Sequence, residues 1–355
     1  MILWVSPSWI IGQPSKTVEF AIDYITLVDL SPGVSLKISN WFQFCILRAV
    51  LGVALAIPIA AIGESPSKVV RIGYQKSGAF LLLKNEGSLE KRLEPLGYRV
   101  EWKEFPSGPP LLEALNAGSL DIGHSGDAPL IFAQSAGIAF EYIGATSPAP
   151  ESAGIVVPKG SLIQTIAELR GKRIAFAKGS SSHFLLARAL AEAGLSFREI
   201  QPIYLQPSEA RAALQSGSVD AWAIWDPFYA AAEIDGEARV LRSGQGLSPH
   251  REFYFARQEF VATHPEIITP LLAALRETGE QALKDPAATA KFLASRLGIS
   301  EAVMLKSELR KPRYGAEPMS PESIAEQQQV ADTFFQLGLV PKAVRTGDVV
   351  FQAKQ

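Results

Sequence analysis

Small hydroxyl residues and glycines gather at three places where a short hydrophobic run gives way to a helical pattern. These places are Ser77-Gly78, Ser125-Gly126 and Gly179-Ser180-Ser181-Ser182. The first N–H groups of a helix have no intrahelical partner and lie at the positive end of its dipole, so such loops suit a bound anion. The same residues are also ordinary helix caps, and the pattern by itself allows either role.

Charged and aromatic side chains beside these loops could complete an anion site. Lys76 and Lys178 each follow a predicted strand and could supply positive charge, and His183 could donate to an oxyanion. Trp222 and Trp225 lie in the run AWAIWDPF, where Trp225 adjoins a loop and could form the wall of a pocket. The alternatives are solvated lysines, a structural histidine and tryptophans of the core.

Motifs of common enzymes are missing from the chain after Gly63. It contains no GxxxxGK(S/T), GxGxxG, HExxH or GxSxG. The histidines at 124, 183, 250 and 264 form no close pair that would suggest a metal site. Ser181 and His183 are two residues apart at a helix start and cannot face each other as nucleophile and base. We therefore expect no catalytic residue, no metal and no cofactor.

A repeated pattern predicts two similar α/β lobes. RIGYQKSGAFLL begins at Arg71 and RIAFAKGSSSHFLL begins at Arg173, and each is a strand, a polar loop and a helix start. LEALNAGSLDIG (112–123) is echoed by RAALQSGSVDAWA (211–223). Alternating strands and helices of this kind form largely parallel sheets. The order of helix, glycine and strand is common in α/β chains, so one such match could arise by chance. Two matched elements in the same order favour two similar lobes.

Ligands of open α/β sheets bind beyond the carboxyl ends of the strands. The loops 75–80, 124–129, 178–184 and 225–228 are therefore expected to converge on one cleft between the lobes. Pro/Gly-rich stretches near 148–157 and 244–255 indicate two crossings between lobes, which would permit a hinge. From Pro265 the pattern is mostly helical, and we expect this tail to pack on the first lobe.

The amino-terminal region has the features of an export signal. Residues 42–62 contain an apolar run that is short for a bilayer-spanning helix, and Ala61-Ile62-Gly63 is an acceptable cleavage site. An uncleaved membrane anchor is the alternative. The mature chain would then lack Cys45, the only cysteine, and so could form no disulfide. With 34 basic and 36 acidic residues and no basic run, nucleic acid is not an expected partner.

Four stretches carry a resemblance to the aliphatic-sulfonate-binding proteins of ABC importers, a family related to the binding proteins for taurine, nitrate and thiamine precursors. The stretches are RIGYQKSG (71–78), GSLDIGHSGDAPLIFAQSAG (118–137), KGSSSHFLLARALAEAGL (178–195) and DAWAIWDPF (220–228). The resemblance implies an α/β, two-lobed periplasmic-binding-protein fold (type II-like) with a helical C-terminal segment. The expected division is 1–63 for the extension and signal peptide, 64–153 and 249–355 for lobe 1, and 154–248 for lobe 2.

The resemblance further implies a monomeric periplasmic receptor that binds a small organic anion, an alkanesulfonate, and delivers it to a membrane ABC permease. The residues expected to face the ligand are Gln75, Lys76, Ser125, Gly126, Asp127, Ser180, Ser181, His183 and Trp225. His124 departs from the pattern, because a small or hydroxyl residue is expected at its position. The alternative ligands are taurine, nitrate, bicarbonate or a thiamine-pyrimidine precursor, and the alternative activity is a pyrimidine-synthesis enzyme on the same fold.

Overall fold

The computed structural model describes residues 68–76, 78–312 and 315–352, which belong to one compact unit, Glu64–Gln355. The predicted extension, the signal segment and the cleavage site near Gly63 lie outside the described residues, as does Ser77. None of the helices in the described ranges combines the length and hydrophobicity that crossing a bilayer requires.

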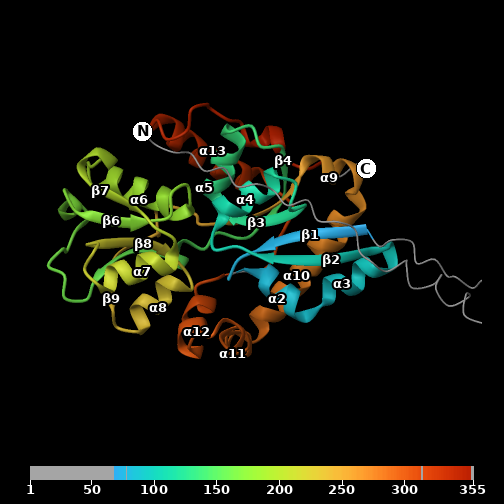
Figure 1. The fold of residues 1–355 in the computed structure, drawn as a ribbon, viewed down its shortest axis with the longest axis horizontal. Helices are drawn as coiled ribbons and strands as arrows, with labels where there is room; N and C mark the ends of the chain where they lie inside the picture. Colours follow the sequence, from blue (N-terminus) through green and yellow to red (C-terminus); the bar gives the residue numbers. More distant parts are fainter. Residues whose placement is uncertain (1–67, 77, 313–314, 353–355) are drawn as a thin grey trace, which may run out of the picture. The chain divides into compact units, whose positions relative to one another are not determined.

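Two five-stranded sheets organise the described chain (Figure 1). The first has the order β2-β1-β3-β10-β4 and the second the order β7-β6-β8-β5-β9. The strands of the first sheet are β1 (Lys68–Tyr74), β2 (Tyr98–Glu104), β3 (Ile122–Gly126), β4 (Phe140–Ala145) and β10 (Glu252–Arg257). Those of the second are β5 (Ala153–Pro158), β6 (Arg173–Phe176), β7 (Gln201–Tyr204), β8 (Ala221–Trp225) and β9 (Ala238–Ser243).

The two sheets have equivalent connectivity, as the sequence repeat predicts. β1 pairs in parallel with β2 and β3, and β6 pairs in parallel with β7 and β8. Each sheet also holds one antiparallel strand next to its centre, β10 in the first and β5 in the second. These two strands directly follow the crossings between lobes, so the chain enters each sheet from the opposite end. The lobe boundaries at 153/154 and 248/249 stay predictions, with β5 beginning at Ala153.

Helices lie between the strands and at the end of the chain. Those of the first lobe are α2 (Ala79–Glu86), α3 (Ser88–Leu93), α4 (Gly108–Asn116) and α5 (Asp127–Ser135). Those of the second lobe are α6 (Ser181–Glu192), α7 (Pro207–Gln215) and α8 (Phe228–Ile234). The carboxyl-terminal helices are α9 (Gln258–Thr263), α10 (Ile268–Lys284), α11 (Pro286–Leu297), α12 (Glu301–Leu309) and α13 (Pro321–Gln336).

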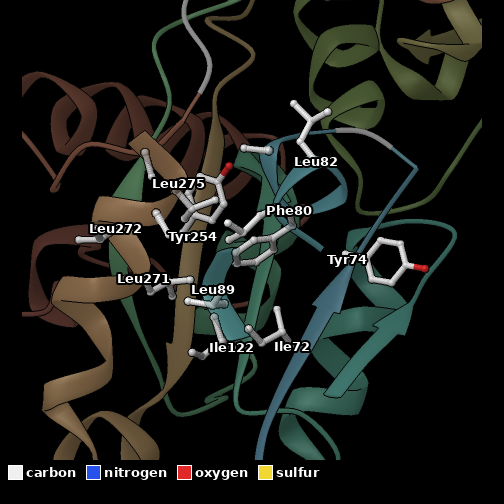
Figure 2. Packing of buried hydrophobic residues seen from close by; sticks show 14 of the residues in the cluster. Ile72, Tyr74, Phe80, Leu82, Leu89, Ile122, Tyr254, Leu271, Leu272 and Leu275 are labelled. Atoms are coloured by element: carbon white, nitrogen blue, oxygen red, sulfur yellow. The ribbon is translucent and has the colours of Figure 1, made fainter. Parts of the chain in front are cut away.

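Helix α10 closes the core of the first lobe although it lies far along the chain from the strands that it covers. Figure 2 shows Phe80 of α2 and Tyr254 of β10 in the same interior as Leu271 and Leu275 of α10. The rings of Phe80 and Tyr254 meet edge to face, with their centroids 5.0 Å apart. Burial of these large apolar groups is the main source of stability for this layer.

The carboxyl-terminal helices contact both lobes, which differs from the expectation that they pack on the first alone. Val303 of α12 packs against Ala230 and Ala231 of α8, in the second lobe. Phe334 of α13 packs against Phe132 of the first lobe and Phe184 of the second. The helical periodicity of this tail showed that it had apolar faces, but it could not show which lobe would cover them.

An arginine–aspartate clamp occurs at the same place in each lobe and accounts for part of the sequence repeat. The Oδ2 atom of Asp121 accepts hydrogen bonds from the backbone N–H and the Nε–H of Arg71, both at 2.9 Å. Asp220 accepts the equivalent bonds from Arg173 at 2.8 and 3.2 Å. The first clamp also includes a second arginine, because Arg257 lies 3.2 Å from Asp121. Each clamp ties one strand, β1 or β6, to the start of its parallel neighbour, β3 or β8.

Asp121→Asn is expected to lower the free energy of unfolding by about 2–3 kcal/mol, because the change removes a buried carboxylate that pairs with both Arg71 and Arg257, although Arg257 keeps its ion pair with Glu259. Asp220→Asn is the matched control and should cost about 1 kcal/mol or less, since its pair is 30–40% exposed. Burial opposes ionisation of Asp121, but the bonds from Arg71 outweigh it and lower the pKa.

The stabilisation by Asp121 is therefore present above the pKa of an unfolded aspartate, about 3.9, and disappears as the pH falls through the lower folded pKa. Urea unfolding of the wild type and both variants at pH 7 and pH 3 measures this loss of stabilisation. Equal losses in the two variants at pH 7 would contradict the argument.

Candidate functional site

All four predicted loops contribute to a group of three cavities that share Trp225. The smallest, here called the serine cavity, has a volume of about 40 Å³. It is lined by Gln75, Gly108, Ser125, Gly126, Pro129, Ser180, Ser181, Trp225, His250, Arg251 and Glu252. Since these residues come from both sheets and their loops, the cavity lies between the two lobes.

The other two cavities differ in chemistry. The aromatic cavity, of about 230 Å³, is lined by Gln75, Lys76, Glu104, Phe105, Pro106, Pro207, Ser208, Trp225, Pro227 and Phe228. The carboxylate cavity, of about 50 Å³, is lined by Gly78, Thr146, Ser147, Ala149, Ser152, Trp225, Asp226, His250, Glu252, Lys311 and Gly315. A polar cavity thus has an apolar neighbour and a charged neighbour.

The structure brings six of the nine predicted ligand-facing residues together in the serine cavity, namely Gln75, Ser125, Gly126, Ser180, Ser181 and Trp225. Lys76 lines the aromatic cavity instead. Asp127 and His183 line none of the three. The roles of all nine residues as ligand contacts stay predictions. The geometry gives Asp127 and His183 a different role each, described below.

Hydrogen-bond donors without a protein partner face the serine cavity. The hydroxyl of Ser125 is fully buried and makes no hydrogen bond. Ser181 and Ser182 form the first turn of α6, whose N–H groups have no intrahelical acceptor. The hydroxyl of Ser180 is already used, because it donates to the carbonyl of Ala177 at 2.7 Å. An anion in this cavity would therefore be held by Ser125 and the start of α6 rather than by the Ser180 hydroxyl.

Two glycines leave the space in which the cavity forms. A Cβ atom on Gly108 would lie 2.0 Å from the Ser125 Oγ and 2.8 Å from the Pro129 Cγ. A Cβ atom on Gly126 would lie 1.9 Å from the Oγ of Ser181, in the opposite lobe. Both glycines are required for space, since neither has a positive φ. The loop of Gly126 and the start of α6 thus meet across the cleft.

Gln75 is held in place by His124, which lies directly behind the cavity. The backbone N–H of Gln75 donates to the His124 Nε2 at 3.1 Å, and the Gln75 side-chain amide donates to the His124 carbonyl at 3.2 Å. The imidazole is fully buried between Phe80 and Tyr254. The residue that departed from the expected pattern therefore acts behind the cavity, where it positions Gln75.

His183 lies among aromatic rings and orders the loop before α6. Its ring contacts the rings of Phe132, Phe176, Phe197 and Phe334. Its Nδ1 accepts a hydrogen bond from the N–H of Gly179 at 3.2 Å. Burial, helped by the charge of Lys178, lowers the pKa of His183 to about 4, so the ring is neutral at physiological pH. It supplies no positive charge for an anion.

Asp127 joins α5 to the second crossing between the lobes. Its Oδ1 accepts from the N–H of Ala128 at 2.7 Å, and its Oδ2 accepts from the hydroxyl of Ser248 at 3.3 Å. These two bonds hold the carboxylate against its own helix start and the crossing, and so fix the geometry of the loop.

The wall formed by Trp225 is held from behind by an ion-pair network. Asp226 accepts from the N–H of Ala230 at 2.9 Å and from the Nη1 of Arg310 at 3.1 Å. The Arg310 guanidinium also lies over the ring of Tyr229, 4.3 Å from its centroid. Burial raises the pKa of Asp226 to about 6 in spite of Arg310. The carboxyl-terminal helices, through Arg310, therefore help to position the loop that carries Trp225.

Several lining residues were not predicted from the sequence. Gly108 follows β2 in the run SGPP, a turn signal that could have been found by the same search for small residues after strands. His250, Arg251 and Glu252 come from the second crossing and the start of β10. Because that strand is antiparallel to its neighbours, a search limited to strand-to-helix loops could not find them.

Comparison with known proteins agrees with this geometry. The family model described as NMT1/THI5 like matches residues 99–289. A relative from Escherichia coli K12, named as an aliphatic-sulfonates-binding protein, is 42% identical over 308 residues, which cover 86% of this chain and 96% of the relative.

Two solved structures are also similar. The alkanesulfonate-binding protein SsuA from Xanthomonas axonopodis pv. citri, bound to MOPS, has a TM-score of 0.77 at 42% identity, covering 80% of this chain and 98% of that one. The periplasmic aliphatic sulphonate binding protein SsuA from Escherichia coli has a TM-score of 0.74 at 43% identity, covering 82% and 94%. The predicted two-lobed α/β fold is confirmed. The chain therefore belongs to the NMT1/THI5-like family and is a member of the aliphatic-sulfonate-binding proteins.

Proposed function

We propose that this protein is the substrate-binding component of an ABC importer for aliphatic sulfonates. The observation that carries the proposal is the serine cavity, where the unpartnered hydroxyl of Ser125 and the start of α6 face a space of about 40 Å³ between the lobes. A sulfonate has three oxygens that accept hydrogen bonds and one negative charge, which match these donors. The family membership supports the same ligand.

The aromatic cavity provides room for the carbon chain of the ligand. It adjoins the serine cavity through Gln75 and Trp225, and its walls include Phe105 and Phe228. Apolar carbon buried against these rings would gain affinity in proportion to the area removed from water. Nitrate and bicarbonate have no alkyl group to fill this space, and their binding would leave the cavity to water.

The cellular location and partner form part of the proposal. We expect export to the periplasm with cleavage near Gly63, and delivery of the ligand to a membrane permease by a monomer. One similar structure and one relative, both from Escherichia coli, are named as periplasmic binding proteins, which supports this location. Amino-terminal sequencing of the exported protein would test the cleavage, and a mature chain that still contained residues 42–62 would contradict it.

Isothermal titration calorimetry of the purified protein with butanesulfonate, nitrate and bicarbonate tests the ligand class. Binding of butanesulfonate with a lower Kd than either inorganic anion is the expected result. Binding of nitrate or bicarbonate more tightly than butanesulfonate would overturn the assignment even though the fold is right. The protein is proposed to bind and release the anion unchanged, so mass spectrometry should recover the same compound from the complex.

Ser125→Ala is expected to weaken sulfonate binding by 1–3 kcal/mol, the usual value of a hydrogen bond to a charged group, which is roughly a 5- to 150-fold rise in Kd. The same change should leave the free energy of unfolding unchanged, because the buried hydroxyl has no partner in the protein. Ser180→Ala is the matched control, since its hydroxyl bonds to Ala177 and should affect stability more than affinity. Calorimetry and urea unfolding measure the two effects, and an unchanged Kd in Ser125→Ala would refute this placement of the anion.

A further inference from the structure

A hydrogen bond joins the two lobes at the edge of the cleft farthest from the crossings. The hydroxyl of Ser107 in the first lobe donates to the Oε1 of Gln206 in the second lobe at 3.0 Å. Ser107 follows β2 and Gln206 follows β7, which are the strands at one end of the two sheets. The crossings join strands toward the other end, β4 to β5 and β9 to β10. This interaction is here called the cleft-edge bond.

We propose that the cleft-edge bond sets how long the cleft stays closed over a bound anion, so that Ser107 and Gln206 control the rate of ligand release. Neither side chain contacts the ligand in this proposal, and each acts by holding the opposite lobe. The inference rests on the proposed function and concerns the regulation of the same site.

The sequence after Ser107 leaves its hydroxyl available for this bond. Ser107 is the N-cap residue of α4, where a serine usually accepts a hydrogen bond from the second or third residue of the helix. In α4 these residues are Pro109 and Pro110, which have no N–H group. The side chain therefore makes no capping bond, and within the described residues it bonds to Gln206 alone. Ser107 is also fully buried, so water cannot replace this partner while the lobes are in contact.

Gln206 occupies the equivalent position in the second lobe. It is the N-cap residue of α7, which has nine residues like α4 and begins at the matching point of the sequence repeat. The backbone N–H of Gln206 donates to the Glu209 Oε2 at 2.9 Å, and Pro207 follows at the first helical position. Both features restrict the loop, so little conformational freedom is lost when the cleft-edge bond forms.

The cleft-edge bond lies beside the groups that are proposed to hold the ligand. A Cβ atom on Gly108, which follows Ser107, would lie 2.0 Å from the Ser125 Oγ. The same two loops also line the aromatic cavity, through Phe105 in the first lobe and Pro207 in the second. Separation of the lobes at this edge requires the bond to break, so the bond opposes release of a sulfonate from either cavity.

Stopped-flow kinetics of butanesulfonate binding to the full protein test the inference. Ser107→Ala should raise the dissociation rate constant about three- to tenfold, the usual effect of one lost hydrogen bond, and should leave the association rate constant unchanged. Gln206→Ala should have the same effect. The double variant should release the ligand no faster than either single variant, because all three lack the same bond. Methanesulfonate should give the same ratios, since the bond joins the lobes and does not involve the ligand.

A serine that does cap its helix provides the matched control. Ser196 caps the short helix Phe197–Glu199 and lines none of the three cleft cavities. Ser196→Ala should lower the unfolding temperature by about 1–3 °C and leave the dissociation rate constant unchanged. Ser107→Ala should show the opposite pattern, because α4 loses no capping bond.

The outcomes separate the two proposals. An unchanged dissociation rate constant in Ser107→Ala would overturn the inference and leave the sulfonate function standing. Additive effects in the double variant would overturn it too, because they would show that the two side chains act separately. An effect of Ser107→Ala that grows with the length of the ligand would place the side chain on the ligand instead, and this comparison decides even if Gln206→Ala does not fold. Failure of the wild type to bind either sulfonate would overturn the proposed function and this inference with it.

Discussion

Replacing Gly126 with valine should weaken the binding of every sulfonate by roughly a hundredfold. Gly126 ends β3 in the first lobe, and even a single Cβ atom there would lie 1.9 Å from the Oγ and 3.2 Å from the Cβ of Ser181, which begins α6 in the second lobe. Rotation of the serine can relieve the first contact but not the second. Overpacking of this kind costs ~1–3 kcal/mol, and the upper value corresponds to about a hundredfold in Kd.

The loss should appear in binding and not in stability, because the two loops belong to different lobes and can separate about the hinge at little cost. The unfolding temperature of the variant is therefore expected to stay close to that of the wild type. Gly160→Val is the matched control, since a Cβ atom on Gly160 meets no atom within 4 Å. Addition of Ser181→Gly to the Gly126→Val variant should restore part of the affinity, because it removes the serine side chain that the valine would overlap.

Calorimetry with butanesulfonate measures the Kd, and thermal unfolding measures the stability, of the wild type, Gly126→Val, Gly160→Val and the double variant. Wild-type affinity in Gly126→Val would mean that the contact between these loops is not part of the bound state. A large drop in the unfolding temperature would mean that the glycine serves folding rather than binding.

Affinity for straight-chain alkanesulfonates should rise with chain length until the aromatic cavity, of about 230 Å³, is filled. Each buried methylene contributes at most ~0.8 kcal/mol, which is about fourfold in Kd. From methanesulfonate to hexanesulfonate this sets an upper limit of roughly a thousandfold, reduced by the ordering of a flexible chain. Trp225→Ala should flatten the series and leave methanesulfonate binding nearly intact, because the donors of Ser125 and α6 remain.

Phe335→Ala serves as the control for loss of an aromatic ring, since Phe335 is half exposed and lies on α13, and it lines none of the three cavities. Its chain-length series should be parallel to that of the wild type. A series that is flat in the wild type would show that the carbon chain stays in water. An unchanged slope in Trp225→Ala would assign the chain to a different wall of the cleft.

The amino-acid sequence alone was sufficient to predict those features of the fold and the site that depend on local patterns. The repeated order of strand, loop and helix predicted two similar lobes. The arginines that begin the two repeats, Arg71 and Arg173, form equivalent clamps. The small residues at 125–126 and 180–181 were predicted to face one cleft, and they line the same cavity. Such residues are informative because the end of a parallel strand and the start of a helix limit both their chemistry and their place.

Only the tertiary structure decided how individual side chains are used. His183 follows a serine-rich loop as a ligand residue would, yet four phenylalanines surround it, two of them from the distant helices α5 and α13. Glu252 is an ordinary strand residue in the sequence, and it reaches the cleft because β10 enters the first sheet antiparallel to β3. The space at Gly126 depends on Ser181 in the other lobe. These roles arise from contacts between residues far apart in the chain, and local periodicity carries no information about which distant surfaces will meet.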